Sequence, residues 1–393
     1  MQMDRVLTVA AGHLVHDTFT AFLSPLLPLI VQKLSISLAT AGALPLVFRL
    51  PSLLNPFIGL WADRIDLRML VVIAPALSAT AMSLIGVAPN LGTLALFVFL
   101  AGCSSAVLHV PAPVIITRVS GRRVGTGMSF WMVGGELART VGPLLAVAVV
   151  TWRTLEGYYP IMVLGWATSV VLYFRLRDVK VQPRSKGTPA PLGDAWRVLR
   201  PLMLPLLAVL LLRSFMQAAL VTFLPILMTS SGKTLWTGGL ALATVEAAGA
   251  AGALAAGIVS DRFGRRRVLG AALLLAPASL LAFLSLDDGG ALSYLLLGLT
   301  GFLLLSTTPV IMAMVQEVGR EYPATANGVY MGISFLLTAG AAPVVGWVGD
   351  AVGLGTAFFW SAILAFVAAP LTLLLPASRR GGSPTGDIVL ADD

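Results

Sequence analysis

Residues 291–316 read ALSYLLLGLTGFLLLSTTPVIMAMVQ, an apolar run without a single Asp, Glu, Lys, Arg or His. A helix needs about 20 apolar residues to cross the hydrocarbon core of a bilayer, so this run is long enough to span it. Because the bilayer core offers no water to the backbone, the run must be helical. The alternative is a closed barrel of alternating strands, which a continuous apolar run does not resemble. The stretch therefore predicts a transmembrane helix.

Runs of this kind fill nearly the whole chain. Hydrophobic residues make up 57% of the 393 residues, charged residues only 11%, and the mean hydropathy is +0.91. This charged share is far below that of soluble domains. Twelve runs can be distinguished, at 6–30, 38–61, 69–88, 92–117, 125–150, 157–174, 202–229, 235–258, 268–286, 291–316, 324–348 and 354–375. The expected fold is an all-α membrane protein with twelve transmembrane helices, surrounded by lipid.

The positions of the charges predict how the chain is oriented. Its net charge of +8 could indicate nucleic-acid binding in a soluble protein. When both termini and the even-numbered connections are assigned to one side of the membrane, however, that side collects 20 of the 26 lysines and arginines. The other side keeps Lys33, Arg153 and Lys233. Cytoplasmic loops are enriched in Lys and Arg, so we expect both termini in the cytoplasm, an inner-membrane location and no nucleic-acid partner.

The chain divides into two halves. Hydropathy collapses between residues 177 and 200, where prolines, glycines and basic residues gather, and this stretch is expected to be a cytoplasmic linker. It separates two bundles of six helices, 1–176 and 201–376, and a cytoplasmic tail follows at 377–393. The lone Cys103 excludes an intramolecular disulfide. We expect a monomer.

The two halves also repeat each other in sequence. The connection after the second run reads GLWADRIDLR from Gly59, and the one after the eighth reads GIVSDRFGRRR from Gly257, an offset of 198 residues. Parallel internal repeats of six helices are typical of many secondary transporters. The repeat therefore predicts two pseudo-symmetric bundles.

These connections resemble the loop signature of the major facilitator superfamily. The second copy fits it at Gly257, Asp261, Arg262, Gly264 and Arg265. The first copy keeps Gly59, Asp63, Arg64 and Arg68 but has Asp66 in place of a glycine. The resemblance implies that both loops hold one conformation through contacts between the halves, a gating role. Positive-inside topology alone is the competing explanation.

Two further matches narrow the resemblance. Gly134, Gly142 and Pro143 are similar to the antiporter signature of drug-exporting members. The segments HDTFTAFLSPLLPLI from His16 and ANGVYMGISF from Ala326 resemble the fosmidomycin-resistance branch, whose members export drugs in exchange for protons. The arginine that many relatives carry early in the fourth helix is absent here, so their proton relay is not transferred to this chain.

Ionisable residues inside the predicted helices are the candidate functional residues. A charged side chain at the bilayer centre costs at least about 2.5–3.5 kcal/mol, so each one retained suggests a function. All of them lie on the first, second, fourth, fifth, seventh and eighth runs: His13, His16, Asp17, Arg49, His109, Glu136, Arg139, Arg213 and Glu246. The resemblance implies that these helices line a central cavity.

We assign these residues to two tasks. Asp17 and Glu136 are the first candidates for proton carriers, followed by Glu246. His13 or His16, beside Asp17, could tune its proton, and His109, in a helix-bending stretch of the kind that lines cavities, is assigned to the same task. Arg49 and Arg213 are the preferred ligands of a substrate anion, Arg139 is a weaker one, and Gln217 is a substrate hydrogen-bonder. The spacing predicts ion pairs Asp17–Arg49, Arg213–Glu246 and Glu136–Arg139. Such pairs can also be purely structural links between helices, and the histidines can be packing residues.

The sequence thus predicts a proton-coupled secondary transporter, with a small and possibly anionic organic solute or drug exported in exchange for protons. An uptake symporter for an organic anion on the same fold is one alternative, and a non-transporting membrane sensor or scaffold is another. No catalytic motif, metal site or cofactor is expected. The Gly125–Gly127 run lacks the lysine and spacing of a nucleotide-binding loop, so ATP is not expected to drive transport.

Overall fold

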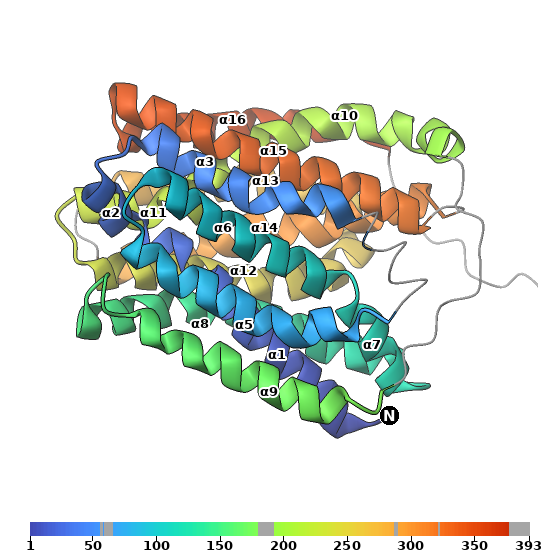
Figure 1. The fold of residues 1–393 in the computed structure, drawn as a ribbon. Helices are drawn as coiled ribbons and strands as arrows, with labels where there is room; N and C mark the ends of the chain where they lie inside the picture. The colour runs from blue at the N-terminus through green and yellow to red at the C-terminus, as the bar shows by residue number, and fades with distance from the viewer. Residues whose placement is uncertain (56–57, 59–65, 180–191, 287–289, 321–322, 377–393) are drawn as a thin grey trace, which may run out of the picture.

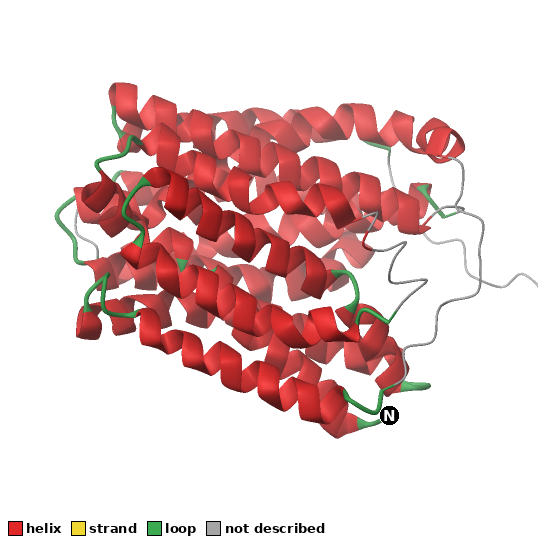
Figure 2. Ribbon diagram, viewed as in Figure 1, coloured by secondary structure: helices red, strands yellow, loops and turns green. Residues whose placement is uncertain are grey.

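A computed structural model describes residues 1–55, 58, 66–179, 192–286, 290–320 and 323–376. Every regular element in these residues is helical, which confirms the all-α class, and the helices lie side by side along one direction (Figures 1 and 2). Up to residue 179 the main helices are α1 (Met3–Thr20), α2 (Leu23–Leu34), α3 (Leu38–Arg49), α5 (Arg68–Leu84), α6 (Leu91–His109), α7 (Ala112–Ser120), α8 (Val124–Arg153) and α9 (Val163–Leu176). From residue 192 they are α10 (Leu192–Ala218), α11 (Leu224–Ser230), α12 (Leu235–Phe263), α13 (Arg265–Leu284), α14 (Ala291–Val318), α15 (Pro323–Val352) and α16 (Leu354–Leu371).

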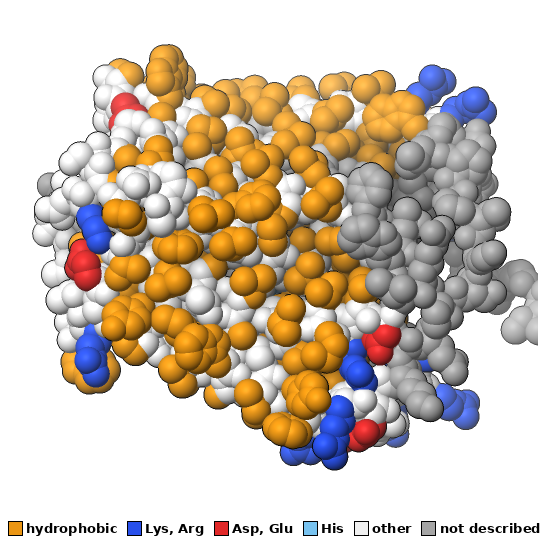
Figure 3. All heavy atoms as spheres, viewed as in Figure 1, with side chains coloured by type: hydrophobic (Ala, Val, Ile, Leu, Met, Phe, Trp, Pro, Cys, Tyr) orange, Lys and Arg blue, Asp and Glu red, His pale blue; other side chains and the backbone are white. Residues whose placement is uncertain are grey.

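Eleven helical segments of the described residues are long and apolar enough to cross a membrane. The run expected at 38–61 is described only as the shorter apolar stretch Leu38–Leu54, so the number twelve stays a prediction. Figure 3 shows the corresponding surface, where hydrophobic side chains form a broad band and charged side chains gather at its two ends. A band of this kind is what a bilayer requires of a spanning protein.

The two ends of the bundle differ. We call the end with the N-terminus and the turns at 121–123 and Gly264 the proximal end, and the end with the turns at 35–37, 154–158, 231–234 and Gly353 the distal end (Figure 1). At the distal end Lys33 Nζ lies 3.1 Å from Glu156 Oε1. Chain segments before residue 180 and after residue 191 are called here the first and second halves.

The halves pack tightly against each other at the distal end. A methyl group added at Gly42 on α3 would lie 2.5 Å from the carbonyl oxygen of Ala342 on α15, so the two backbones meet there without a side chain between them. Asp350, at the end of α15, accepts hydrogen bonds from the backbone amides of Leu38 (2.8 Å) and Ala39 (2.9 Å). Its carboxylate therefore caps the first turn of α3 from the other half.

Several glycines near the proximal end have no close neighbour among the described residues. A methyl group added at Gly125 on α8, Gly257 on α12, or Gly328 and Gly332 on α15 would meet no described atom within 4 Å. Leu254 of α12 is 77% exposed in the same region. Close backbone contact between the halves is thus found at the distal end.

Candidate functional site

Four ionisable side chains of the first half meet in one cluster, named here the histidine–aspartate cluster: His13, His16 and Asp17 of α1 and His109 at the end of α6. His16 is fully buried, His13 nearly so, and the Asp17 side chain is 13% exposed. His109 is 38% exposed and forms the open side of the cluster. His13 and His16 lie beside Asp17, as their spacing on one helix predicts, and His109 joins them from α6.

Backbone carbonyls fix the tautomers of two of these rings. His13 Nδ1 lies 2.8 Å from the carbonyl oxygen of Trp131, and His109 Nδ1 lies 2.9 Å from that of Ser105, so both nitrogens carry a proton and donate it. The His13 ring also stacks on Trp131 of α8, with ring centroids 3.7 Å apart. When these rings are neutral, their Nε2 atoms carry no proton and present a lone pair.

The third ring lies between Ser104 and Asp17. The hydroxyl of Ser104 lies 2.7 Å from the carbonyl oxygen of Ala74 and 3.1 Å from His16 Nε2, and it can donate its proton to either. His16 Nδ1 lies 2.8 Å from Asp17 Oδ1 and donates to it in the tautomer that carries the proton there. With neutral His13 and His109 and an ionised Asp17, only lone pairs would meet between those three side chains. They therefore need at least one additional cation or proton between them.

A second group of charges crosses between the halves and is named here the carboxylate–arginine triad: Glu136 and Arg139 of α8 and Glu246 of α12. Arg139 is paired with Glu136 three residues before it, as expected from the spacing, and its Nε lies 3.4 Å from Glu246 Oε2. Glu246 is 8% exposed, whereas Glu136 and Arg139 are 34% and 45% exposed. One arginine thus serves two carboxylates from opposite halves.

Arg213 of α10 is 1% exposed and has neutral partners. Its guanidinium donates to the hydroxyls of Thr307 and Thr308 on α14 and, at 2.8 Å, to the side-chain oxygen of Gln217 one turn further on. No carboxylate among the described residues forms an ion pair with it. The predicted ion pair between Arg213 and Glu246 is therefore wrong, because Glu246 contacts Arg139 of the other half instead.

Arg49, at the end of α3, is exposed and forms no ion pair within the described residues. Its guanidinium carbon lies 4.8 Å from the ring centre of Phe335 on α15 and 5.4 Å from that of Phe48. The expected contact ion pair with Asp17 is therefore not formed, since the three histidines surround that carboxylate.

The loop motif of the second half makes contacts within that half. Arg265 lies 3.4 Å from Asp261, four residues earlier, and 2.7 Å from Glu317 at the end of α14. Gly264, between the motif's arginines, has a φ of 90° and ends α12. Arg262 is exposed at the last turn of α12. Among the described residues, the ion pair of Asp261 is thus with Arg265 of its own half, and the contact between halves implied for Asp261 stays a prediction.

In the first copy, Gly59, Asp63 and Arg64 lie outside the described residues. Arg68 donates to the carbonyl oxygens of Leu176 (3.0 Å) and Val179 (3.3 Å), and its Nε lies 3.9 Å from Asp66. This arginine therefore ties the start of α5 to the end of α9, again within one half.

The glycines of the predicted antiporter signature are close-approach positions between α8 and α1. A methyl group at Gly134 would lie 2.6 Å from the carbonyl oxygen of Ala10, and one at Gly142 would lie 2.7 Å from Cβ of Ala21. Pro143 follows inside α8. Gly135, beside the first of them, leaves room for the His13 ring, because a methyl group there would lie 2.7 Å from its Cε1.

Several contributing residues were not anticipated from the sequence. Trp131 and Ser104 orient the histidines, and Asp350 caps α3 from the other half. Their sequence neighbourhoods carry no signal for these roles, because each partner is distant in the chain. A Trp inside an apolar run and an acid at a helix end are otherwise ordinary features.

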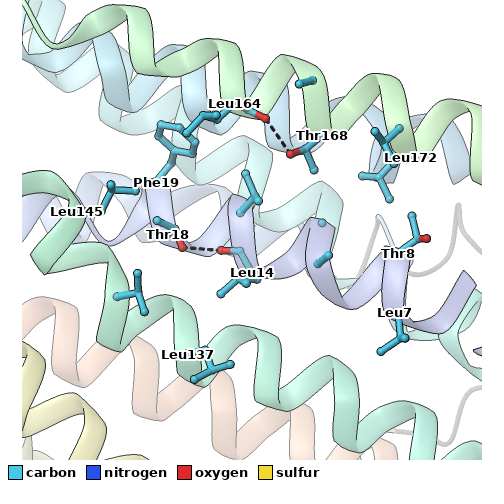
Figure 4. Close-up of a pocket in the computed structure, with 16 residues that line it drawn as sticks. Leu7, Thr8, Leu14, Thr18, Phe19, Leu137, Leu145, Leu164, Thr168 and Leu172 are labelled. Atoms are coloured by element: carbon cyan, nitrogen blue, oxygen red, sulfur yellow. Dashed lines mark hydrogen bonds between the residues drawn. The ribbon is translucent and has the colours of Figure 1, made fainter. Parts of the chain in front are cut away.

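An apolar pocket of about 710 Å³ lies away from all of these charges, between α1, α8 and α9 (Figure 4). Leu137 and Leu164 line it, and the hydroxyls of Thr18 and Thr168 donate to the carbonyls of Leu14 and Leu164 on their own helices. Its lining residues include no ionisable side chain. It therefore suits an apolar group rather than an ionic solute.

Comparisons with known proteins agree with this geometry. The sequence pattern of the Major Facilitator Superfamily matches residues 9–339. The fosmidomycin resistance protein of Escherichia coli (strain K12) is 26% identical over 388 residues, which cover 95% of this chain and 92% of that protein. A bacterial homologue of the human lysosomal transporter Spinster, solved in an inward-facing conformation, has a TM-score of 0.81 at 16% identity and covers 95% and 96% of the two chains. A D-xylose–proton symporter has a TM-score of 0.76 at 12% identity and covers 97% and 100%. These two likenesses show the fold.

Proposed function

The chain belongs to the Major Facilitator Superfamily, is related to the fosmidomycin-resistance branch and is a multi-pass membrane protein, and from this premise we propose that it is a proton-coupled exporter of a small organic anion. The observation that carries the proposal is the carboxylate–arginine triad, in which Arg139 holds one acid of its own half and one of the other. The name of the fosmidomycin resistance protein favours efflux as the direction. Two bundles of six helices, with the boundaries expected from the sequence, remain the framework of the proposal.

The triad has one acid more than it has bases. With both carboxylates ionised its formal charge is −1, and one proton makes it neutral. Burying an uncompensated charge is costly, and Glu246 is the most buried member. Glu246 is therefore the favoured proton carrier whenever Arg139 is withdrawn from it, and Glu136 keeps the arginine neutralised on its own helix.

The position of the triad links its charge to the conformation of the halves. Glu246 lies two helical turns, about 10 Å, along α12 from Gly239, where a methyl group would meet Val147 of α8 at 2.8 Å. The Arg139–Glu246 contact thus adds to the distal packing between the halves. Breaking it weakens the distal closure, and forming it again favours closure.

Exchange follows from competition for one guanidinium. A substrate anion entering from the proximal end displaces Glu246 from Arg139, and the distal contact loosens. On the distal side the anion leaves and Glu246 takes up a proton. The distal end then closes with Glu246 protonated, the proton departs proximally, and the ionised Glu246 pairs with Arg139 again, which holds the distal end closed. With the proximal end in the cytoplasm, as the charge distribution predicts, this cycle is export against proton entry.

The substrate class rests on the two exposed arginines. Arg139 is 45% exposed, and Arg49 is held over Phe335 without an acidic partner among the described residues. A guanidinium can bind a carboxylate or phosphonate through two parallel hydrogen bonds. Arg213 is enclosed by threonines, so we consider it a less favoured anion ligand than Arg49 and Arg139. Gln217 accepts a hydrogen bond from Arg213 and orients it.

The test is flux in proteoliposomes with an imposed pH gradient and a panel of organic carboxylates and phosphonates, with fosmidomycin as one member. Glu246→Gln keeps the shape of the side chain and loses the titrating proton. We expect it to abolish pH-gradient-driven flux while exchange of substrate for substrate continues. Glu156→Gln, at the exposed ion pair with Lys33 outside the triad, is the matched control and should keep both activities.

Undiminished pH-gradient drive in Glu246→Gln would remove the triad from the coupling step. Movement of proton and solute in the same direction would instead establish the symporter alternative. Absence of flux for every solute, with folded protein in the liposomes, would favour the sensor or scaffold.

A further inference from the structure

Three donor atoms of the histidine–aspartate cluster converge on one point. His13 Nε2 lies 3.1 Å from Asp17 Oδ2 and 3.2 Å from His109 Nε2, and the third side of this triangle, between His109 Nε2 and Asp17 Oδ2, is 3.5 Å. The two nitrogens bear lone pairs in the neutral rings, and a carboxylate oxygen only accepts. Three electron-pair donors thus lie within 3.5 Å of one another, and a shared cation or proton would remove the repulsion between their lone pairs.

The dimensions of this triangle match a tetrahedral metal site. Zinc bonds to His nitrogen and carboxylate oxygen are about 2.0–2.2 Å long, which places neighbouring ligand atoms of a tetrahedron about 3.3–3.6 Å apart. The three distances in the cluster agree with this range within about 0.2 Å, the tolerance for a credible site. Two imidazoles sharing one tetrahedral ion would have ring centres about 5.2 Å apart, and those of His13 and His109 are 5.0 Å apart.

The surroundings hold the ligands in the form that binds metal. Metal-ligating histidines usually donate their other ring N–H to a carbonyl or carboxylate, and here the carbonyls of Trp131 and Ser105 take this role. His13 is further fixed by stacking on Trp131 and by the space left at Gly135. Asp17 receives its other contact from His16. The donor set is therefore preorganised on α1 and α6.

The cluster is most exposed at His109. The side chain of His13 is 6% exposed and that of Asp17 13%, whereas that of His109 is 38% exposed. An ion would be reached past His109, and water or a solute would be its fourth ligand. Two imidazoles and one carboxylate suit Zn²⁺ and similar divalent transition metals, and oxygen-seeking Mg²⁺ and Ca²⁺ much less.

We propose that His13, Asp17 and His109 form a binding site for a divalent transition metal ion, with Zn²⁺ as the best fit. The ion would link α1 to α6 and, through the carbonyl of Trp131, to α8. The inference does not depend on the proposed transport function, because the triad at Glu246 shares none of these ligands.

The first experiment measures metal binding directly on the full chain, purified in detergent without a polyhistidine tag and freed of metal with a chelator. The chain has only three histidines and one cysteine, so competing soft ligands are few. Zn²⁺ titration by calorimetry should give one site per chain. Co²⁺ should give the visible absorption of a tetrahedral ion.

Variants distinguish the loss of a metal ligand from misfolding of the whole chain. His109→Ala and Asp17→Asn should weaken Zn²⁺ binding at least about 100-fold. Removing a residue that only supports a metal ligand costs up to about 100-fold, and removing the ligand itself should cost no less. Glu246→Gln and Cys103→Ser are the controls and should bind Zn²⁺ as the native chain does. Thermal unfolding without metal identifies any variant that is misfolded.

The decisive outcome concerns the native chain. If it binds neither Zn²⁺ nor Co²⁺, or binds them no more tightly than His109→Ala does, the cluster is occupied by protons and the metal proposal is overturned. Loss of Zn²⁺ binding in Glu246→Gln or Cys103→Ser would place the ion elsewhere and also overturn it. Transport results leave this outcome untouched.

Discussion

Gly42→Ala should open the distal end, and the size of this effect can be worked out from one backbone contact. The methyl group of Gly42→Ala would lie 2.5 Å from the carbonyl oxygen of Ala342, whereas ordinary van der Waals contact begins at 3.4 Å. The partner is backbone and cannot rotate away, so α3 and α15 must separate by several tenths of an ångström. Overpacking of this kind typically costs about 1–3 kcal/mol. Because the cost falls on the distally closed state alone, the open state should gain about 5–150-fold in relative population.

Cysteine labelling measures this shift. In a Cys103→Ser background, Ala342→Cys places a thiol at a position that is 1% exposed in the distal contact. The rate of its reaction with a maleimide in detergent should rise by the same 5–150-fold when Gly42→Ala is added. The matched control is Gly332→Ala on α15, whose methyl group meets nothing within 4 Å. Both changes raise helix propensity alike. Equal labelling rates in the two variants would refute the reasoning.

Three further predictions use the same protein. Arg49→Lys should weaken binding of an anionic substrate about tenfold or more, which corresponds to the loss of one charge-assisted hydrogen bond. Arg213→Lys should chiefly lower thermal stability. Binding affinities and melting temperatures of the two variants test both expectations. Reporter fusions should place Lys186 and the C-terminal tail on one side and Asp288 on the other, and a common location for Lys186 and Asp288 would contradict the twelve-helix topology. The hydrogen bond from Lys33 lowers the pKa of Glu156, so its small stabilisation is present at neutral pH and is lost as the pH falls through that lowered pKa. Glu156→Gln should therefore lower stability by at most about 0.5 kcal/mol at pH 7 and by nothing in acid, since the pair is exposed.

The sequence was sufficient for the fold because the bilayer imposes a strong and local rule. Apolar length alone predicted the helices, and the segment from Leu91 to Ser120 matches the run expected at 92–117. The Glu136–Arg139 pair was predictable for the same reason, since spacing on one helix fixes it. The copy of the loop motif at Asp261 likewise identified the superfamily without any structure.

Contacts between distant segments were not predictable. The repeat offset suggested Arg213 as the partner of Glu246, but the repeat relates positions within each half and carries no information on packing across the interface, where Arg139 lies. The histidine–aspartate cluster joins positions 96 residues apart, so no short motif marks it. Burial of Arg213 among threonines depends on how α10 meets α14, which hydropathy does not determine.

The carboxylate of Asp350 holds the backbone amides of positions 38 and 39 rather than their side chains. Mutations can therefore remove this contact almost only by replacing Asp350. A random mutagenesis screen for chains that open distally should recover many different replacements of Asp350. At positions 38 and 39 it should recover proline, which lacks the N–H group, and few other residues. The attachment itself thus depends on the acid and on two N–H groups, and not on which side chains stand at positions 38 and 39.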